Sequence, residues 1–198
     1  VWQLFGGVPD LQLIRFLQIL FSLVTILLVY AVGRLAFGAA VGLLACAVYA
    51  LYPTLVGYDS LLLTEGLFNL LLMTACLAFL LAAGARRWPG VLCSCVGLGL
   101  ALGLAALTRS IAWPFLLLLA PTLLFVLRGS WLVRLSAPIV MLLGFAIVVG
   151  PWAVRNTTLQ GVPVLVDTMG GMNLYMGNYE HTPLNRAWDA IRLRGDKF

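Results

Sequence analysis

The sequence predicts an all-α fold: a polytopic bundle of about six transmembrane helices with a short extracytoplasmic C-terminal segment. Apolar residues make up 63% of its 198 residues and charged residues 10%, whereas a soluble domain carries about a quarter charged residues. The apolar residues gather in six runs, each approaching the roughly 20 residues needed to cross a bilayer. These runs are rich in Leu and Ala and lack the alternation typical of strands, so we expect helices.

The six expected spans follow one another with short turns between them. They cover about residues 10–35, 37–55, 60–83, 89–107, 111–127 and 131–152. Pro9-Asp10 is a plausible start of the first span and Tyr52-Pro53 the end of the second. Beyond the last span we expect a short strand over 162–166 and a turn at Gly170-Gly171.

Small residues recur at the spacing that lets two helix backbones approach closely. Gly38 and Gly42 form one such pair, and Gly99 and Gly103 form another. The simplest interpretation is packing between helices of one bundle.

Charged residues assign the two sides of the membrane. Five arginines follow the first, third and fifth spans with no acidic residue beside them: Arg34, Arg86, Arg87, Arg128 and Arg134. The positive-inside rule places these turns in the cytoplasm, so the other turns and everything after Arg155 face outward. We therefore expect a transmembrane bundle over residues 1–155 and an extracytoplasmic segment over 156–198.

Several classes of function find no support in the sequence. The net charge of +5 is scattered rather than clustered, which argues against a nucleic-acid partner. The four cysteines lie inside apolar runs without zinc-ligand spacing, and His181 is the single histidine. Phosphate-binding Gly-Lys-Ser/Thr loops, dinucleotide fingerprints and Ser/His/Asp sets are also missing.

Glu65 is the acidic residue that the pattern places inside a span. If the third span begins near residue 60, Glu65 lies about one and a half turns into it, with Asn69 on the same face. A carboxylate at mid-membrane costs about 2.5–3.5 kcal/mol on insertion scales. Two interpretations stay open: a functional group facing a cavity, a cation or a metal, or an ion pair with an arginine of a neighbouring span.

The other outward polar residues suggest a site for an anion. Asp59 precedes the third span, and Arg109 lies between the fourth and fifth. Arg155 and Asn156 follow Trp152 where the last run ends, and an arginine there offers a planar fork of donors to phosphate oxygens. The alternatives are a solvated turn for Arg109 and interfacial snorkelling for Arg155.

The Gly-rich segment 167–178, with Asn173, is either a lid or substrate-binding loop or a purely structural loop.

Three segments in order resemble one family. They are Tyr52–Glu65, Gly99–Arg109, and Pro151–Asn156 with Gly170–Asn178. Together they resemble the GT-C membrane glycosyltransferases, most closely the dolichyl-phosphate-mannose–protein mannosyltransferase-like group with its bacterial lipid-A aminoarabinose transferase relatives.

That resemblance implies an inverting transfer of a sugar from a polyprenyl-phosphate donor to a protein, lipid or glycan acceptor on the outer face. It implies a multi-pass protein of the bacterial inner (plasma) membrane, in contact with membrane lipid. Its general base is an Asp expected before Val1, so this chain looks like the middle of a longer enzyme. Substrate-binding residues are then expected at Arg155, Arg109, Glu65, Asp59, Asn156 and Asn173.

No cofactor is certain on this interpretation, and a divalent metal stays open. A competing hypothesis is a polytopic transporter or lipid flippase without transferase activity. Such a protein predicts broken helices around a polar site at mid-membrane. Glu65 has no inverted-repeat partner, which favours the transferase.

Overall fold

The apolar runs of the sequence fold into helices throughout the part that the structure describes. The computed structural model describes residues 11–61, 63–180 and 182, without the side chains of 58–60. Its elements are α1 (Leu11–Phe37), α2 (Ala39–Leu51), α3 (Pro53–Ser60), α4 (Glu65–Gly84), α5 (Trp88–Thr108), η1 (Ser110–Ala112), α6 (Phe115–Val126), α7 (Trp131–Gln160) and α8 (Gly170–Asn178). The chain divides into two units, Val1–Pro151 and Trp152–Phe198, which are described separately below.

Four of the described helices are long and apolar enough to cross a membrane. These are α1, α4, α5 and α7, with 27, 20, 21 and 30 residues. At a rise of about 1.5 Å per residue, each reaches the roughly 30 Å thickness of the hydrocarbon core. They correspond to the first, third, fourth and sixth apolar runs, and they confirm an all-α polytopic bundle.

The second and fifth runs form shorter helices than expected. The second run gives α2, of 13 residues, followed after Tyr52 by α3. Gly38 turns the chain with a φ of 100°, and Tyr52 is extended (φ −71°, ψ 113°) because Pro53 follows it. The fifth run is divided between η1 and the 12-residue α6. The described chain thus has four long helices and two shorter apolar ones.

Three boundaries differ from the expectations and bear on the site. Helix α4 begins at Glu65 rather than near residue 60, so Glu65 lies in its first turn. Helix α7 continues past Trp152 to Gln160 and carries Pro151 within it. The predicted strand over 162–166 is wrong, because this segment is irregular, and the predicted turn at Gly170-Gly171 is instead the start of α8.

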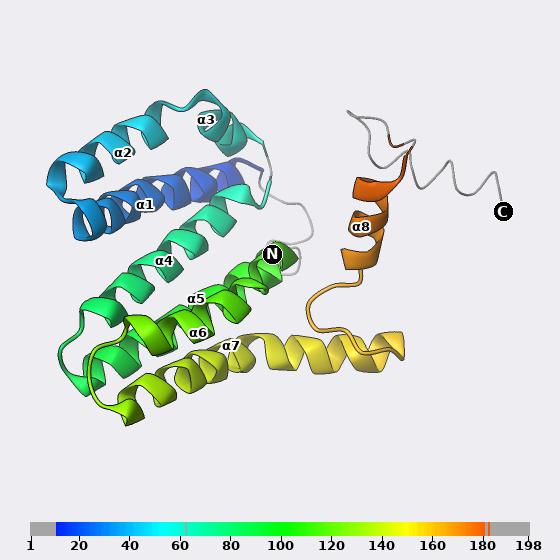
Figure 1. Cartoon of the computed structure of the whole chain (residues 1–198). Coiled ribbons are helices and arrows are strands. Elements are labelled where there is room, and N and C mark those ends of the chain that lie inside the picture. The colour runs from blue at the N-terminus through cyan, green and yellow to red at the C-terminus, as the bar shows by residue number, and fades with distance from the viewer. Residues whose placement is uncertain (1–10, 62, 181, 183–198) are drawn as a thin grey trace. The chain divides into compact units, whose positions relative to one another are not determined.

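The turns of the first unit separate into two ends. Figure 1 shows the α1–α2, α4–α5 and α6–α7 turns at one end of the bundle, on the left of the view. The beginning of α4 and the end of α5 lie at the other end. Helix α1 contacts both α2 and α4, and α4 also contacts α5. The five arginine-bearing positions therefore gather at one end, and Glu65 and Arg109 at the other.

Glycine brings α5 against α7. A Cβ built on Gly99 would lie 2.1 Å from the carbonyl oxygen of Met141, and one on Gly103 would lie 2.8 Å from Cβ of Val148. Gly144 of α7 meets the carbonyl oxygen of Val96 at 2.9 Å in the same way. Gly99 and Gly103 are therefore packing residues, because close approach of the two backbones leaves no room for a side chain.

The two glycines of the other pair, Gly38 and Gly42, have different roles. Gly42 packs against α1, where an added Cβ would lie 2.9 Å from the carbonyl oxygen of Tyr30. Gly38 has open space around it and serves the turn before α2 instead.

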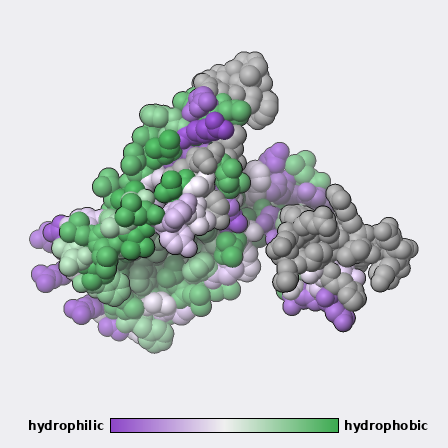
Figure 2. Space-filling view, turned by 90° about the horizontal axis from the view of Figure 1, so that it is seen from above, coloured by the Kyte–Doolittle hydropathy of each residue, from purple (hydrophilic) through white to green (hydrophobic). Residues whose placement is uncertain are grey.

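The lateral surface of the bundle is apolar. Leu27, Leu117, Phe125 and Ile147 are between 67% and 83% exposed, and Figure 2 shows hydrophobic residues over much of the visible face. In water a surface of this kind would be an aggregation hazard. An apolar surface of this kind is suited to contact with lipid, so the helices are those of a multi-pass membrane protein.

Candidate functional site

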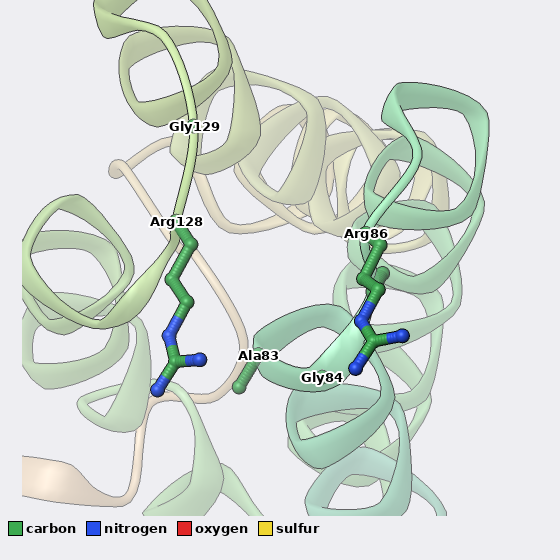
Figure 3. A pocket seen from close by; sticks show the side chains of 6 residues that line it. Ala83, Gly84, Arg86, Arg128 and Gly129 are labelled. Atoms are coloured by element: carbon green, nitrogen blue, oxygen red, sulfur yellow. The ribbon is translucent and has the colours of Figure 1, made fainter.

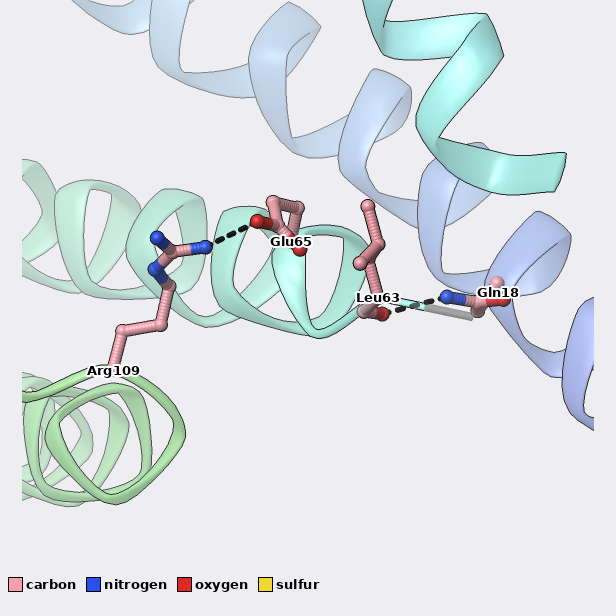
Figure 4. Close-up of polar contacts among 4 residues, drawn as sticks. All are labelled: Gln18, Leu63, Glu65 and Arg109. Atoms are coloured by element: carbon pink, nitrogen blue, oxygen red, sulfur yellow. Dashed lines mark hydrogen bonds and ion pairs between the residues drawn. The ribbon is translucent and has the colours of Figure 1, made fainter. Parts of the chain in front are cut away.

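An ion pair joins α4 and α5 at the end of the bundle opposite the basic turns. Nη1 of Arg109 donates to Oε1 of Glu65, and Figure 4 shows the arginine reaching from the end of α5 to the beginning of α4. The guanidinium also lies over the ring of Phe68, with 6.0 Å between its central carbon and the ring centroid. Of the two interpretations of Glu65, the structure therefore forms the one with an arginine partner.

Local structure explains why these two side chains meet. Glu65 is the first residue of α4, where a carboxylate interacts favourably with the positive end of the helix dipole. Arg109 is the residue that ends α5, with an extended backbone (φ −146°, ψ 118°). Its N–H donates to the carbonyl of Ala105 at 2.8 Å, which closes the last turn of the helix. Packing of α4 on α5 then sets one helix end beside the other.

The pair retains unused capacity for hydrogen bonding. The Arg109 side chain is 43% exposed and that of Glu65 27% exposed, and a pair this wet contributes about 0–1 kcal/mol to stability. Oε2 of Glu65 is buried and has no hydrogen-bond partner among the described residues. A guanidinium carries five N–H donors, and Glu65 engages one nitrogen of it. The arrangement can therefore accept a donor at Glu65 and give donors to an anion at Arg109.

Gln18 is a residue at this end that sequence reasoning missed. It lies in α1, is 6% exposed, and donates from Nε2 to the carbonyl oxygen of Leu63 at 2.6 Å (Figure 4). Its Oε1 has no partner within the described part of the chain. Because Leu63 comes two residues before Glu65, this bond fixes the approach of the chain to α4. The available signal was a glutamine inside an apolar run.

Arg155 belongs to the second unit, where it has its own local contacts. Its Nη1 donates to Oδ1 of Asn156 at 3.2 Å, and its guanidinium lies 5.6 Å from the ring centroid of Trp152. Such a cation–π contact is worth about 0.5–1 kcal/mol at an exposed site. Arg155 is exposed and Asn156 half-buried. These contacts hold the guanidinium near its helix while its surface stays open.

The chain after α7 is tied back to that helix. Nε1 of Trp152 donates to the carbonyl of Val166 at 2.9 Å, and the N–H of Val164 donates to Oγ1 of Thr157 at 3.0 Å. Both valines are buried. The N–H of Met169 then donates to Oδ1 of Asp167 just before α8. Side-chain bonds to α7 thus replace the ladder of the strand that was expected here.

The structure places the side chains of Asn173 and Asn69 but not that of Asp59. Asn173 lies in α8 and is exposed, and the segment it belongs to is helical from Gly170 to Asn178. The side chain of Asp59 lies outside the described residues. Asn69 is half-buried one turn after Glu65 in α4. Within the described ranges, no group of three or more His, Cys, Asp or Glu side chains could hold a metal ion.

One comparison with known proteins identifies the family. The family model described as dolichyl-phosphate-mannose-protein mannosyltransferase matches residues 1–154 of the chain. The long apolar helices and this match define the class, a membrane glycosyltransferase of the GT-C type. The chain belongs to the dolichyl-phosphate-mannose-protein mannosyltransferase family. No curated protein and no solved structure matches it.

The matched residues include one part of the predicted site. Asp59, Glu65 and Arg109 lie within residues 1–154. Arg155, Asn156 and Asn173 lie beyond them. Membership of the family supports glycosyl transfer in general, with a polyprenyl-phosphate sugar and an acceptor as its substrates in general.

Proposed function

We propose that the protein transfers a sugar from a polyprenyl-phosphate donor to an acceptor on the outer face of the membrane, with inversion at the anomeric carbon. The observation that carries this proposal is the Glu65–Arg109 pair, set at the end of the bundle away from the basic turns. By the positive-inside rule that end faces outward. Family membership supplies the general reaction, and the pair supplies residues for it.

The chemistry requires one bond to form as another breaks. An oxygen of the acceptor attacks the anomeric carbon, and the bond from that carbon to the donor phosphate breaks. The acceptor hydroxyl loses its proton to a general base, which we assign to none of the described residues. The leaving polyprenyl phosphate gains negative charge in the transition state. A positioned guanidinium stabilises this charge more than it stabilises the bound donor, which is the condition for catalysis.

Arg109 is our candidate for that guanidinium in the first unit. Glu65 orients it through the ion pair, and Phe68 supports its planar face. The unpaired Oε2 of Glu65 is then available to the acceptor hydroxyl, or to a divalent cation if the reaction uses one. Arg155, steadied by Trp152 and Asn156, is our candidate for holding the donor phosphate. Asp59 and Asn173 stay candidates for contacts with substrate.

The proposal is tested with the full-length protein in liposomes of bacterial inner-membrane lipid, the membrane in which we place it. The probes are radiolabelled polyprenyl-phosphate sugars, mannose and aminoarabinose among them, with protein, lipid and glycan acceptors. We expect donor-dependent labelling of an acceptor and release of polyprenyl phosphate, and a product whose anomeric configuration is opposite to that of the donor. Retention of configuration would contradict inversion. Translocation of the donor across the bilayer without transfer would favour the flippase.

Treatment with a chelator distinguishes the two roles proposed for Glu65, contact with the acceptor hydroxyl and contact with a divalent cation. Full activity after treatment with excess EDTA excludes a divalent metal from the reaction. Loss that Mg²⁺ or Mn²⁺ restores would assign the cation to the protein.

A further inference from the structure

A second polar site lies at the opposite end of the bundle from Glu65 and Arg109. A pocket of about 450 Å³ opens there between the α4–α5 turn and the α6–α7 turn. Its lining consists of Ala83, Gly84, Ala85, Arg86, Arg128 and Gly129. Figure 3 shows the two arginines on either side of the pocket, with Ala83 and Gly84 between them and both guanidinium groups extended.

The pocket concentrates positive charge without a counter-charge from either of the two turns that form it. The sequence has no Asp or Glu between Glu65 and Asp167, so neither turn supplies a carboxylate. Two guanidinium groups that share a hollow repel each other unless an anion lies between them. The positive-inside rule accounts for arginines on this side of the membrane, but it does not require two of them to line one pocket.

Tryptophans place this pocket at the depth of the lipid head groups. Trp88 begins α5 directly after Arg86 and Arg87, and Trp131 begins α7 three residues after Arg128. Both rings are exposed, at 41% and 68%. Trp is enriched where hydrocarbon meets water, because its ring is apolar and its N–H needs a polar partner. Anionic phosphates of the membrane lie at the same level.

We propose that this pocket binds the phosphate of an anionic phospholipid, with Arg86 and Arg128 as its two ligands. A guanidinium presents parallel N–H donors that match phosphate oxygens. The volume falls within the range of about 300–1,000 Å³ typical of small-molecule sites, so the glycerol next to the phosphate also fits. The site lies at the end of the bundle away from the Glu65–Arg109 pair and is independent of sugar transfer.

The test measures thermal unfolding of the purified full-length protein in a neutral detergent. Phosphatidylglycerol, phosphatidylcholine or inorganic phosphate is added in increasing amounts, because a ligand that binds only the folded state stabilises it by RT ln(1 + [L]/Kd) and so raises Tm once its concentration exceeds Kd. We expect Tm to rise with the logarithm of the phosphatidylglycerol concentration, and to rise much less with the other two additives. In Arg86→Gln/Arg128→Gln, the phosphatidylglycerol concentration that gives a fixed rise of Tm should increase about tenfold or more.

The matched control is Arg34→Gln/Arg87→Gln. It removes two charges from the same side of the membrane, but from residues outside the pocket lining. For this variant the phosphatidylglycerol concentration that gives the same rise of Tm should stay within about twofold of wild type. Equal shifts in the two double variants would show general surface attraction and overturn the site.

An equal response to phosphatidylcholine would also overturn the proposal, and so would an equal response to inorganic phosphate. Should the double variant fail to fold, the single variants Arg86→Gln and Arg128→Gln decide. Each should increase several-fold the phosphatidylglycerol concentration needed for the same rise of Tm. A single variant that leaves the phosphatidylglycerol response unchanged would count against its residue.

Discussion

At the scale of single residues, Arg155 is the candidate whose surroundings make the sharpest prediction. Its guanidinium rests on Trp152 and bonds Asn156, yet it is exposed. If it holds the donor phosphate, Arg155→Ala should lower the rate of transfer about tenfold to a thousandfold, as removing one charge-stabilising donor does elsewhere. Arg155→Lys keeps the charge without the fork and should be partly impaired. Wild-type turnover and donor affinity in a normally folded Arg155→Ala would make the residue an interfacial anchor.

Gln18 predicts an effect on stability. The variant Gln18→Met keeps the length of the side chain but cannot donate to the carbonyl of Leu63. The bond is partly buried, and an intramolecular hydrogen bond contributes about 0.5–1.5 kcal/mol net, so the unfolding temperature in detergent should fall. An unchanged unfolding temperature would mean that the bond to Leu63 contributes nothing to the fold.

The sequence alone indicated Glu65 and Arg109 more clearly than it indicated Gln18. Glu65 and Arg109 stand out in the sequence because charges are rare in it, and an ion pair was one of two open interpretations of Glu65. Which arginine would pair with it depends on how α4 packs on α5, and that packing is a tertiary property. Gln18 gave a weaker signal, because a neutral amide in a long apolar run satisfies no charge pattern.

At the scale of elements, the contact of α5 with α7 makes a prediction about stability. In Gly99→Ala the new Cβ would lie 2.1 Å from the backbone oxygen of Met141, so the helices must move apart. Overpacking of this kind typically costs about 1–3 kcal/mol, occasionally more.

The control, Gly97→Ala, lies in the same helix with nothing within 4 Å of the new atom. It should be neutral or gain up to about 1 kcal/mol from helix propensity. Reversible unfolding in mixed micelles measures both variants, and equal stabilities would contradict the packing.

Element boundaries were less predictable than the elements themselves. Hydropathy marks a long apolar helix clearly, so α1, α4, α5 and α7 correspond to expected runs. Tyr52-Pro53 did mark the end of α2, but hydropathy does not show that α7 continues through Pro151. The predicted strand failed because Thr157 and Trp152 bond the backbone of that segment to α7.

At the scale of the whole molecule, the distribution of charge predicts the orientation in the membrane. Single cysteines at Arg87→Cys and Asn178→Cys, in a background with the four native cysteines replaced, are labelled in intact cells by an impermeant reagent. We expect labelling at position 178 and none at position 87, because arginine-bearing turns stay in the cytoplasm. The opposite result would overturn the topology and place the Glu65–Arg109 pair inside.

The pocket between Arg86 and Arg128 illustrates the limit of sequence at this scale. The sequence assigns both arginines to one side of the membrane, as Figure 1 bears out for their turns. It does not show that the two turns enclose a common hollow. The hollow forms because four helix ends lie around it. The positions of those ends depend on tertiary packing, so the order of residues in the sequence does not predict them.

The measurement that tests the central claim most directly is sugar transfer by Arg109→Ala. It is compared with Arg87→Ala, which removes the same charge from the opposite end of the bundle. Both full-length variants are assayed in liposomes with the polyprenyl-phosphate donor, at equal amounts of folded protein. We predict a loss of about a hundredfold or more in kcat/KM for Arg109→Ala, and activity within about twofold of wild type for Arg87→Ala. Equal activity of Arg109→Ala and wild type would contradict the account and leave the Glu65–Arg109 pair a purely structural link between α4 and α5.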